Sequence, residues 1–396
     1  MATRIVGIGT ALPPYAYEQA EVKAIMRRWV GGERRVDRTL ERVYAHSGIQ
    51  RRHSVVPDFV SAEAAASTSS PSPSDRRAEP LFLGADGFGR PSTGARNERY
   101  VAAAPGLLER AARRALAASP AALRDRVSHV ITVSCTGFSA PGVDDHLVRS
   151  LGLPATTERY HLGFMGCYAA FPALRMAHAF CRAEPDAVVL VAAVELCTLH
   201  LDPNREVDSI LSTSVFADGA AAALVTAASD EGGAYPALEL LASATTLTEE
   251  GRADMAWTIG DHGFEMVLTS YVPRVLEAEA GAAVAPLLRS GDVSLADVDA
   301  WAVHPGGRAI LDKVEQGLGL AGPMLGASRA VLAEAGNMSS ATVLFVLERL
   351  LGGRCADLTQ PSPTLEPLRD GALVATLAFG PGLTVDSALV RVAAPR

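Results

Sequence analysis

Cys167 is the first of three residues, far apart in the sequence, that could carry out thiol chemistry. It follows a glycine-rich turn in HLGFMGCYAAFPALR and precedes a predicted helix. A thiol at a helix N-terminus feels the positive end of the helix dipole, which favours the thiolate. The flanking Gly163 and Gly166 permit a tight, exposed turn. Cys167 is therefore a candidate nucleophile, and the alternative is a buried, inert cysteine.

His304 and Asn337 are the candidate partners of this thiol. His304 ends an apolar strand in WAVHPGGRAILDKVEQ, where α/β sheets present catalytic groups. Asn337 lies between Gly336 and a helix predicted from Ser339. It could cap that helix, or its amide could polarise a thioester carbonyl or hold an enolate. The remaining histidines lack such framing and are interpreted as structural or surface residues.

Short β-branched runs and longer Ala/Leu-rich stretches alternate around these motifs. The pattern predicts strands at 4–8, 129–133, 187–194, 220–225, 300–303 and 373–378, and helices at 111–118, 144–151, 310–317 and 339–351. Alternation of this kind indicates α/β layers with parallel or mixed sheets. Phe379-Gly380-Pro381-Gly382 then forms either a simple turn or a rigid loop that lines the site. The Ser/Pro/Gly-rich segment 54–99 is expected to be a surface excursion, partly helical near 61–66.

Composition narrows the classes of function. The 396 residues are 48% hydrophobic, carry a net charge of −8 and include five cysteines without a C-x-x-C pair. These values predict a large core, no nucleic-acid partner, no disulfide framework and no zinc ribbon. No signal peptide or membrane span is apparent, so we expect a soluble, cytoplasmic protein. The pair Arg51–Arg52 could hold a phosphate-bearing ligand.

Taken together, the motifs identify a family. HPGGRAILDKVEQ, GNMSSATVLFVLE, FGPGLT and FADGAAAALV resemble the type III polyketide synthases, the chalcone-synthase-like enzymes of the thiolase superfamily. The resemblance covers essentially the whole chain. It implies an α/β, thiolase-like αβαβα fold of five layers with two similar halves: 1–235 carrying the nucleophilic cysteine, and 236–396 carrying the histidine and asparagine. It also implies a homodimer.

The resemblance assigns roles to the three residues. Cys167 is the expected nucleophile, His304 its base and ion-pair partner, and Asn337 the oxyanion partner. Acyl-CoA and malonyl-CoA are the expected substrates, and no metal or redox cofactor is needed. A ketoacyl synthase III-like initiator of fatty-acid synthesis is the alternative enzyme. A papain-type hydrolase and a non-catalytic acyl-binding protein are the other classes considered.

Pocket residues follow from the same resemblance. Phe216 and Met266 match the two gatekeeper positions, Ala140 a position that reaches the neighbouring subunit's cavity, and Arg42 a CoA contact. Small groups at Ala140 and Cys197 indicate a fatty acyl starter, whereas Trp257 narrows one side of the pocket. Cys135, Glu195 and Ser339 occupy the positions of a hydrogen-bond relay that drives aldol cyclisation. Because a thiol is a poor donor, we expect lactonisation to an α-pyrone, with a resorcinol as the open alternative.

Overall fold

A large mixed sheet organises the molecule. The computed structural model describes residues 2–59, 79–84, 87–202, 206–227, 236–248, 250–269, 271–358 and 366–394. Within them, nine strands form one hydrogen-bonded sheet in the order β13-β14-β15-β10-β1-β9-β8-β6-β7. Their bounds are β1 Arg4–Ala11, β6 His129–Ser134, β7 Glu158–Gly163, β8 Val188–Leu196, β9 Asp218–Thr226, β10 Ala237–Leu247, β13 Ala300–Val303, β14 Leu373–Gly380 and β15 Thr384–Ala393.

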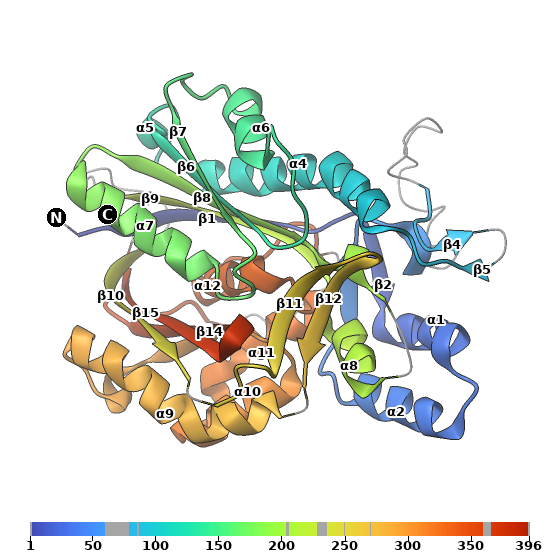
Figure 1. The fold of residues 1–396 in the computed structure, drawn as a ribbon. Coiled ribbons are helices and arrows are strands. Elements are labelled where there is room, and N and C mark those ends of the chain that lie inside the picture. Colours follow the sequence, from blue (N-terminus) through green and yellow to red (C-terminus); the bar gives the residue numbers. More distant parts are fainter. Residues whose placement is uncertain are drawn as a thin grey trace.

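The sheet folds into two layers that enclose helices. β1 and β10 join the two parts through only two pairs, Arg4↔Glu239 and Ile5↔Leu238. Helices α7 (Ala170–Ala183) and α12 (Thr342–Leu350) lie between the parts, as Figure 1 shows. Helices α4 (Thr93–Ala117) and α6 (Val143–Ser150) cover one outer face, and α9 (Val272–Gly291) and α10 (Arg308–Leu318) cover the other. The predicted five-layered α/β architecture is confirmed.

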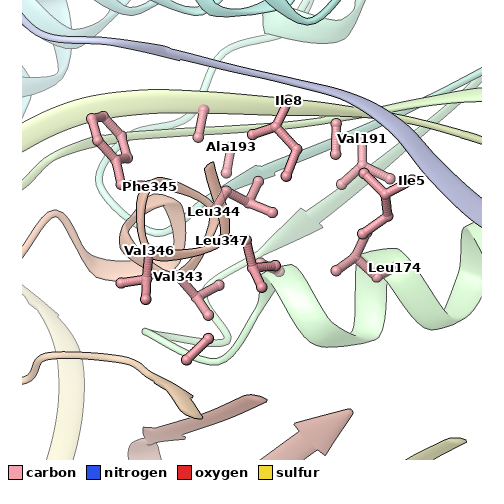
Figure 2. Close-up of a cluster of buried hydrophobic side chains, with 14 of the residues drawn as sticks. Ile5, Ile8, Leu174, Val191, Ala193, Val343, Leu344, Phe345, Val346 and Leu347 are labelled. Carbon is pink, nitrogen blue, oxygen red and sulfur yellow. The ribbon is translucent and has the colours of Figure 1, made fainter. Parts of the chain in front are cut away.

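The central helix α12 shows why the layers form in this order. Its sequence TVLFVLERL is apolar on nearly every side, and Val343 to Leu347 are all buried. A helix of this kind must lie inside the protein, because no face suits water. Figure 2 shows these side chains packed against Ile5, Ile8 and Val191 of the sheet and Leu174 of α7. Strand β8 is likewise buried along its whole length, as its unbroken apolar run predicted.

The described residues form further helices and strands. They are β2 (Tyr15–Glu18), α1 (Gln19–Val30), α2 (Arg34–Ala45), β3 (Arg51–Ser54), β4 (Leu83–Gly84), β5 (Gly87–Phe88), α5 (Ala121–Arg124), α8 (Val207–Val215), β11 (Met255–Gly260), β12 (Gly263–Leu268) and α11 (Gly326–Ala335). Single 3-10 turns include Ser339–Ala341, which begins α12, and Pro381–Leu383, which joins β14 to β15. The predicted strands and helices outside segment 54–99 are therefore confirmed.

The prediction for segment 54–99 is partly wrong. Helix α4 already begins at Thr93, because the Ser92 side chain accepts a bond from the Ala95 amide as a helix cap. Phe59 and Phe82 are buried, and the buried Asp58 carboxylate accepts bonds from the amides of residues 81 to 83. These ends are thus part of the core. The helix expected near 61–66 lies outside the described residues, as does residue 235 at the predicted boundary between the two halves.

Candidate active site

The three predicted catalytic residues line one cavity. Cys167 lies in the turn before α7, His304 directly follows β13, and Asn337 follows α11. The rest of the wall is mostly apolar and includes Cys135, Thr136, Cys197, Phe216, Met255, Trp257, Met266, Leu268, Ile310, Ser339, Phe379 and Pro381. The cavity has a volume of about 50 Å³. The structure therefore brings together every predicted pocket residue except Ala140 and Arg42.

The Cys167 turn is interlocked with the Gly-Pro loop. Gly166 has a φ of +84°, and a side chain there would collide with the Pro381 ring. A side chain at Gly380 would collide with the Tyr168 ring. These contacts leave room only for glycine, so the loop at 379–382 fixes the backbone that carries the thiol. Phe379 and Pro381 line the cavity, so the loop lies where the cavity-lining interpretation of this motif expects it.

His304 is enclosed beside the thiol. Its side chain is 1% exposed, and its backbone amide donates to the Leu377 carbonyl at 2.7 Å. Neither ring nitrogen has a hydrogen-bond partner within the described residues. Burial lowers the pKa of His304 to about 3, which favours the neutral ring. A neutral imidazole with a free nitrogen can accept a proton.

The expected resting ion pair between Cys167 and His304 stays a prediction. Burial raises the pKa of the Cys167 thiol to about 12, although hydrogen bonds from Ser339 and Asn337 act in the opposite direction. Each group alone thus favours its neutral form, because an isolated charge in this apolar cavity is costly. A thiolate is stabilised here only if its proton moves to a nearby base, which leaves an opposite charge beside it.

Asn337 is held by its own backbone. Its amide donates to the Val215 carbonyl at 2.9 Å, and its carbonyl accepts from Ala217 at 2.8 Å. Its side-chain oxygen accepts from the Ser339 amide at 2.9 Å, which leaves the Nδ2 group directed to the Gly306 carbonyl at 3.4 Å. The side chain therefore caps the following turn. The second N–H of its Nδ2 group remains available as a donor to a ligand.

The hairpin β11–β12 forms one wall of the cavity. Trp257 lies opposite Met266, and Met255 lies opposite Leu268, so one face of the hairpin lines the cavity. The Trp257 indole donates to the Cys135 carbonyl at 2.9 Å, which fixes the ring across the cavity. Ala140 is exposed and lies outside the cavity lining of this chain. Its predicted role requires a second subunit and stays a prediction.

The predicted relay through Cys135, Glu195 and Ser339 is wrong in its serine. The Cys135 backbone amide does donate to the Glu195 carboxylate, at 3.0 Å. The buried Glu195 carboxylate accepts bonds from the Thr136 hydroxyl at 2.9 Å and from the Ser340 hydroxyl. Ser339 has a φ of +47°, and this left-handed turn gives Ser339 to the cavity and Ser340 to the carboxylate. Burial raises the pKa of Glu195 to about 7. Sequence spacing did not reveal Thr136 or Ser340.

An outer pocket adjoins the cavity. The two share the lining residues Leu268, Gly306 and Ile310. The outer pocket has a volume of about 530 Å³, and its cationic residues are the predicted Arg42 together with Arg35 and Arg308. Arg308 was not predicted, although its place beside the HPGG motif was a usable signal. Arg51 instead pairs with Glu18 at 2.5 Å, and Arg52 is fully buried, so the proposed phosphate site at that pair is wrong.

A cysteine, a histidine and an amide that converge in a dry cavity define a site for acyl transfer through a thioester. Models of the chalcone and stilbene synthases match residues 84–229 for the N-terminal domain and 239–394 for the C-terminal domain. The alpha-pyrone synthesis polyketide synthase-like protein Pks18 of Mycobacterium tuberculosis is 30% identical over 278 residues, which are 70% of this chain and 68% of that protein.

Solved structures of polyketide synthases are similar to this chain along its whole length. PKS-I from the brown alga Ectocarpus siliculosus is 30% identical, covers 98% of both chains and superposes with a TM-score of 0.85. The fungal type III polyketide synthase ORAS is 26% identical, covers 100% of both chains and gives a TM-score of 0.80.

The chain therefore belongs to the type III polyketide synthases of the chalcone and stilbene synthase family. It is an acyltransferase, since members of this family catalyse decarboxylative condensation with acyl-CoA and malonyl-CoA. Within the described residues, no helix combines the length and the apolar character that crossing a bilayer requires.

Proposed function

We propose that this enzyme loads a fatty acyl group from CoA onto Cys167, extends it with malonyl-CoA and releases an α-pyrone. The carrying observation is that Cys167, His304 and Asn337 line one apolar cavity that adjoins an arginine-lined pocket. The apolar lining of the inner cavity suits the acyl carbons next to the thioester. The outer pocket suits the phosphates of CoA, because one guanidinium group can donate two parallel hydrogen bonds to a phosphate.

The loading step begins from a neutral Cys167 thiol and a neutral His304 ring. As Cys167 attacks the thioester carbonyl, its proton moves to the free nitrogen of His304. The CoA thiolate leaves and takes that proton. The products are an acyl-Cys167 thioester and free CoA, and His304 is neutral again.

The extension step uses the two donors. Malonyl-CoA loses CO₂, and the electron pair of the broken bond forms an enolate. His304 and the Asn337 Nδ2 group donate to its oxygen, which carries the charge. Phe216 supplies an apolar wall where a carboxylate is disfavoured. The enolate carbon then attacks the acyl-Cys167 carbonyl, and the thiolate of Cys167 leaves.

Starter and product are the finer part of the proposal. The apolar wall of Phe216, Met266, Leu268 and Ile310 supports an apolar starter. An enol oxygen that attacks the terminal thioester gives the pyrone and needs no strong acid beside the carbonyl. The relation to Pks18, whose name refers to alpha-pyrone synthesis, supports the same product.

The decisive experiment is an incubation of the purified enzyme with acyl-CoAs of several chain lengths and labelled malonyl-CoA, with products identified by mass. We expect pyrones from long-chain starters. A resorcinol would differ by the loss of one further CO₂. Preference for carrier-protein thioesters over CoA thioesters would support the ketoacyl synthase III-like alternative. An absence of any condensed product would contradict the proposal.

A homodimer, a cytoplasmic location and a division at 235/236 also stay predictions. β7 is the terminal strand of the sheet, and none of its residues is buried, so its edge is available for pairing with a second copy. Sedimentation of the purified protein tests this, and a monomer at micromolar concentration would contradict it.

A further inference from the structure

Arg52 is a fully buried cation behind the catalytic cavity. It lies on β3, its exposed fraction is 0%, and its guanidinium lies 5.5 Å from the centre of the Tyr17 ring. A buried charge is costly unless it is compensated, so a buried arginine requires a reason. Its position relative to Phe216 and Asn337 supplies one.

The guanidinium binds the end of helix α8. Its Nη1 group donates to the Thr213 carbonyl at 2.8 Å and to the Phe216 carbonyl at 2.6 Å. The last carbonyls of a helix lack partners within the helix and carry the negative end of its dipole. A cation therefore suits this place. It holds Phe216, the residue at the gatekeeper position, which directly follows α8 as its C-cap.

The stem of the same side chain packs against the Asn337 turn. A Cβ atom on Gly336 would lie 2.9 Å from the Arg52 Cγ atom and 3.1 Å from its Cδ atom. Gly336 has a φ of +75°, and it turns the chain into Asn337. Asn337 and Phe216 are themselves joined as an isolated bridge. One side chain thus contacts the backbone of both segments.

We propose that Arg52 is a positioning residue that sets Asn337 and Phe216 relative to each other for decarboxylation of malonyl-CoA. It acts through these two residues, because it is not part of the cavity lining. The inference rests on the proposed function, since it assigns both groups to the enolate step. Loading of Cys167 uses His304 as the base, so we expect Arg52 to affect loading much less than decarboxylation.

Arg96 offers a matched control. It is also buried, at 1% exposure, and its Nη1 group donates to two carbonyls, of Leu199 at 2.6 Å and Leu201 at 2.8 Å. Neither of these residues lines the catalytic cavity. Arg52→Met and Arg96→Met therefore remove comparable contacts, but only the first removes a link to Phe216 and the Asn337 turn.

The experiment measures two rates in each variant: acylation of Cys167 followed by mass, and CO₂ release from malonyl-CoA. In Arg52→Met we expect kcat for CO₂ release to fall by about 10- to 100-fold, because small misplacements of reacting groups cause losses of this size. Acylation should change by less than about twofold. Arg96→Met should lose similar thermal stability and keep both rates. Arg52→Lys should recover part of the CO₂ release, because an ammonium reaches one carbonyl but lacks the planar fork.

Equal losses of both rates in Arg52→Met, or an equal loss of CO₂ release in Arg96→Met, would overturn the inference. If Arg52→Met does not fold, Arg52→Lys decides by the same criterion, since it keeps the charge. If the wild type itself releases no CO₂, the proposed function fails. A crystal structure of the Arg52 variant then decides the inference, and an unchanged 2.8 Å bond from Ala217 to Asn337 would overturn it.

Discussion

The catalytic cavity and the outer pocket adjoin each other but differ in physical character. The cavity is small, apolar and closed around buried groups such as His304 and Asn337. The pocket is about ten times larger by volume, 530 against 50 Å³, and carries three arginines. Charge that develops in the cavity is stabilised by few, fixed donors, whereas charge in the outer pocket is also stabilised by water. Mutations in the cavity should therefore act on kcat, and mutations in the pocket on KM.

The largest effect is expected for Cys167→Ala. Without the thiol no thioester can form, so acyl loading should be abolished. Intact-protein mass spectrometry after incubation with an acyl-CoA measures this. Retained loading would show that Cys167 is not the nucleophile. Cys181→Ala is the control, since Cys181 is a buried residue of α7 and does not line the cavity.

A smaller but still large effect is expected for His304→Gln. The thiol pKa is raised to about 12, so its thiolate fraction at pH 7 is very small unless a base takes the proton. Alkylation of Cys167 by iodoacetamide should be sharply slower in the variant at pH 7. It should then rise with pH toward the thiol pKa. Equal alkylation rates in variant and wild type at pH 7 would show that His304 does not activate the thiol.

Arg42→Ala tests the outer pocket. It should raise KM for the CoA thioester several-fold, by about 1 kcal/mol of binding, and leave kcat nearly unchanged. The difference should shrink as salt increases, because exposed charges are screened. Arg38→Ala on the same helix is the control, since Arg38 is exposed and does not line the pocket. A lower kcat with unchanged KM would contradict the division of roles.

The smallest effect on rate is expected for Trp257→Ala. Removing the indole enlarges the cavity and frees the Cys135 carbonyl, so product lengths or accepted starters should shift upward while the condensation rate changes little. Val267→Ala, on the opposite face of the hairpin and 38% exposed, is the control. An unchanged product distribution would mean that Trp257 does not limit the chain.

The alternation of strands and helices was predictable, because the layered core leaves its pattern in runs such as the fully buried β8. The triad was predictable for a similar reason: its residues lie at strand and helix ends in distinctive motifs. The start of α4 was not, since Gly94 and the preceding Ser and Pro suggested a loop. Arg96 and Tyr100, four residues apart in α4, lie on the helix face that is buried.

Other features depend on information that spacing does not carry. Whether Ser339 or Ser340 meets Glu195 is decided by one backbone angle at Ser339. The burial of Arg52 is decided by carbonyls more than 160 positions away in the chain. A charged residue within a short strand is ordinarily interpreted as a surface residue, so the sequence does not distinguish the fully buried Arg52 from the half-buried Arg51.

The contact between Gly166 and Pro381 also limits how this enzyme can be redesigned. At that contact even a methyl group has no room, so substitutions there would displace the nucleophile. The β11–β12 hairpin, by contrast, presents four replaceable side chains to the same space. Libraries intended to alter product size should therefore diversify positions 255, 257, 266 and 268 and leave both glycines at 166 and 380 untouched.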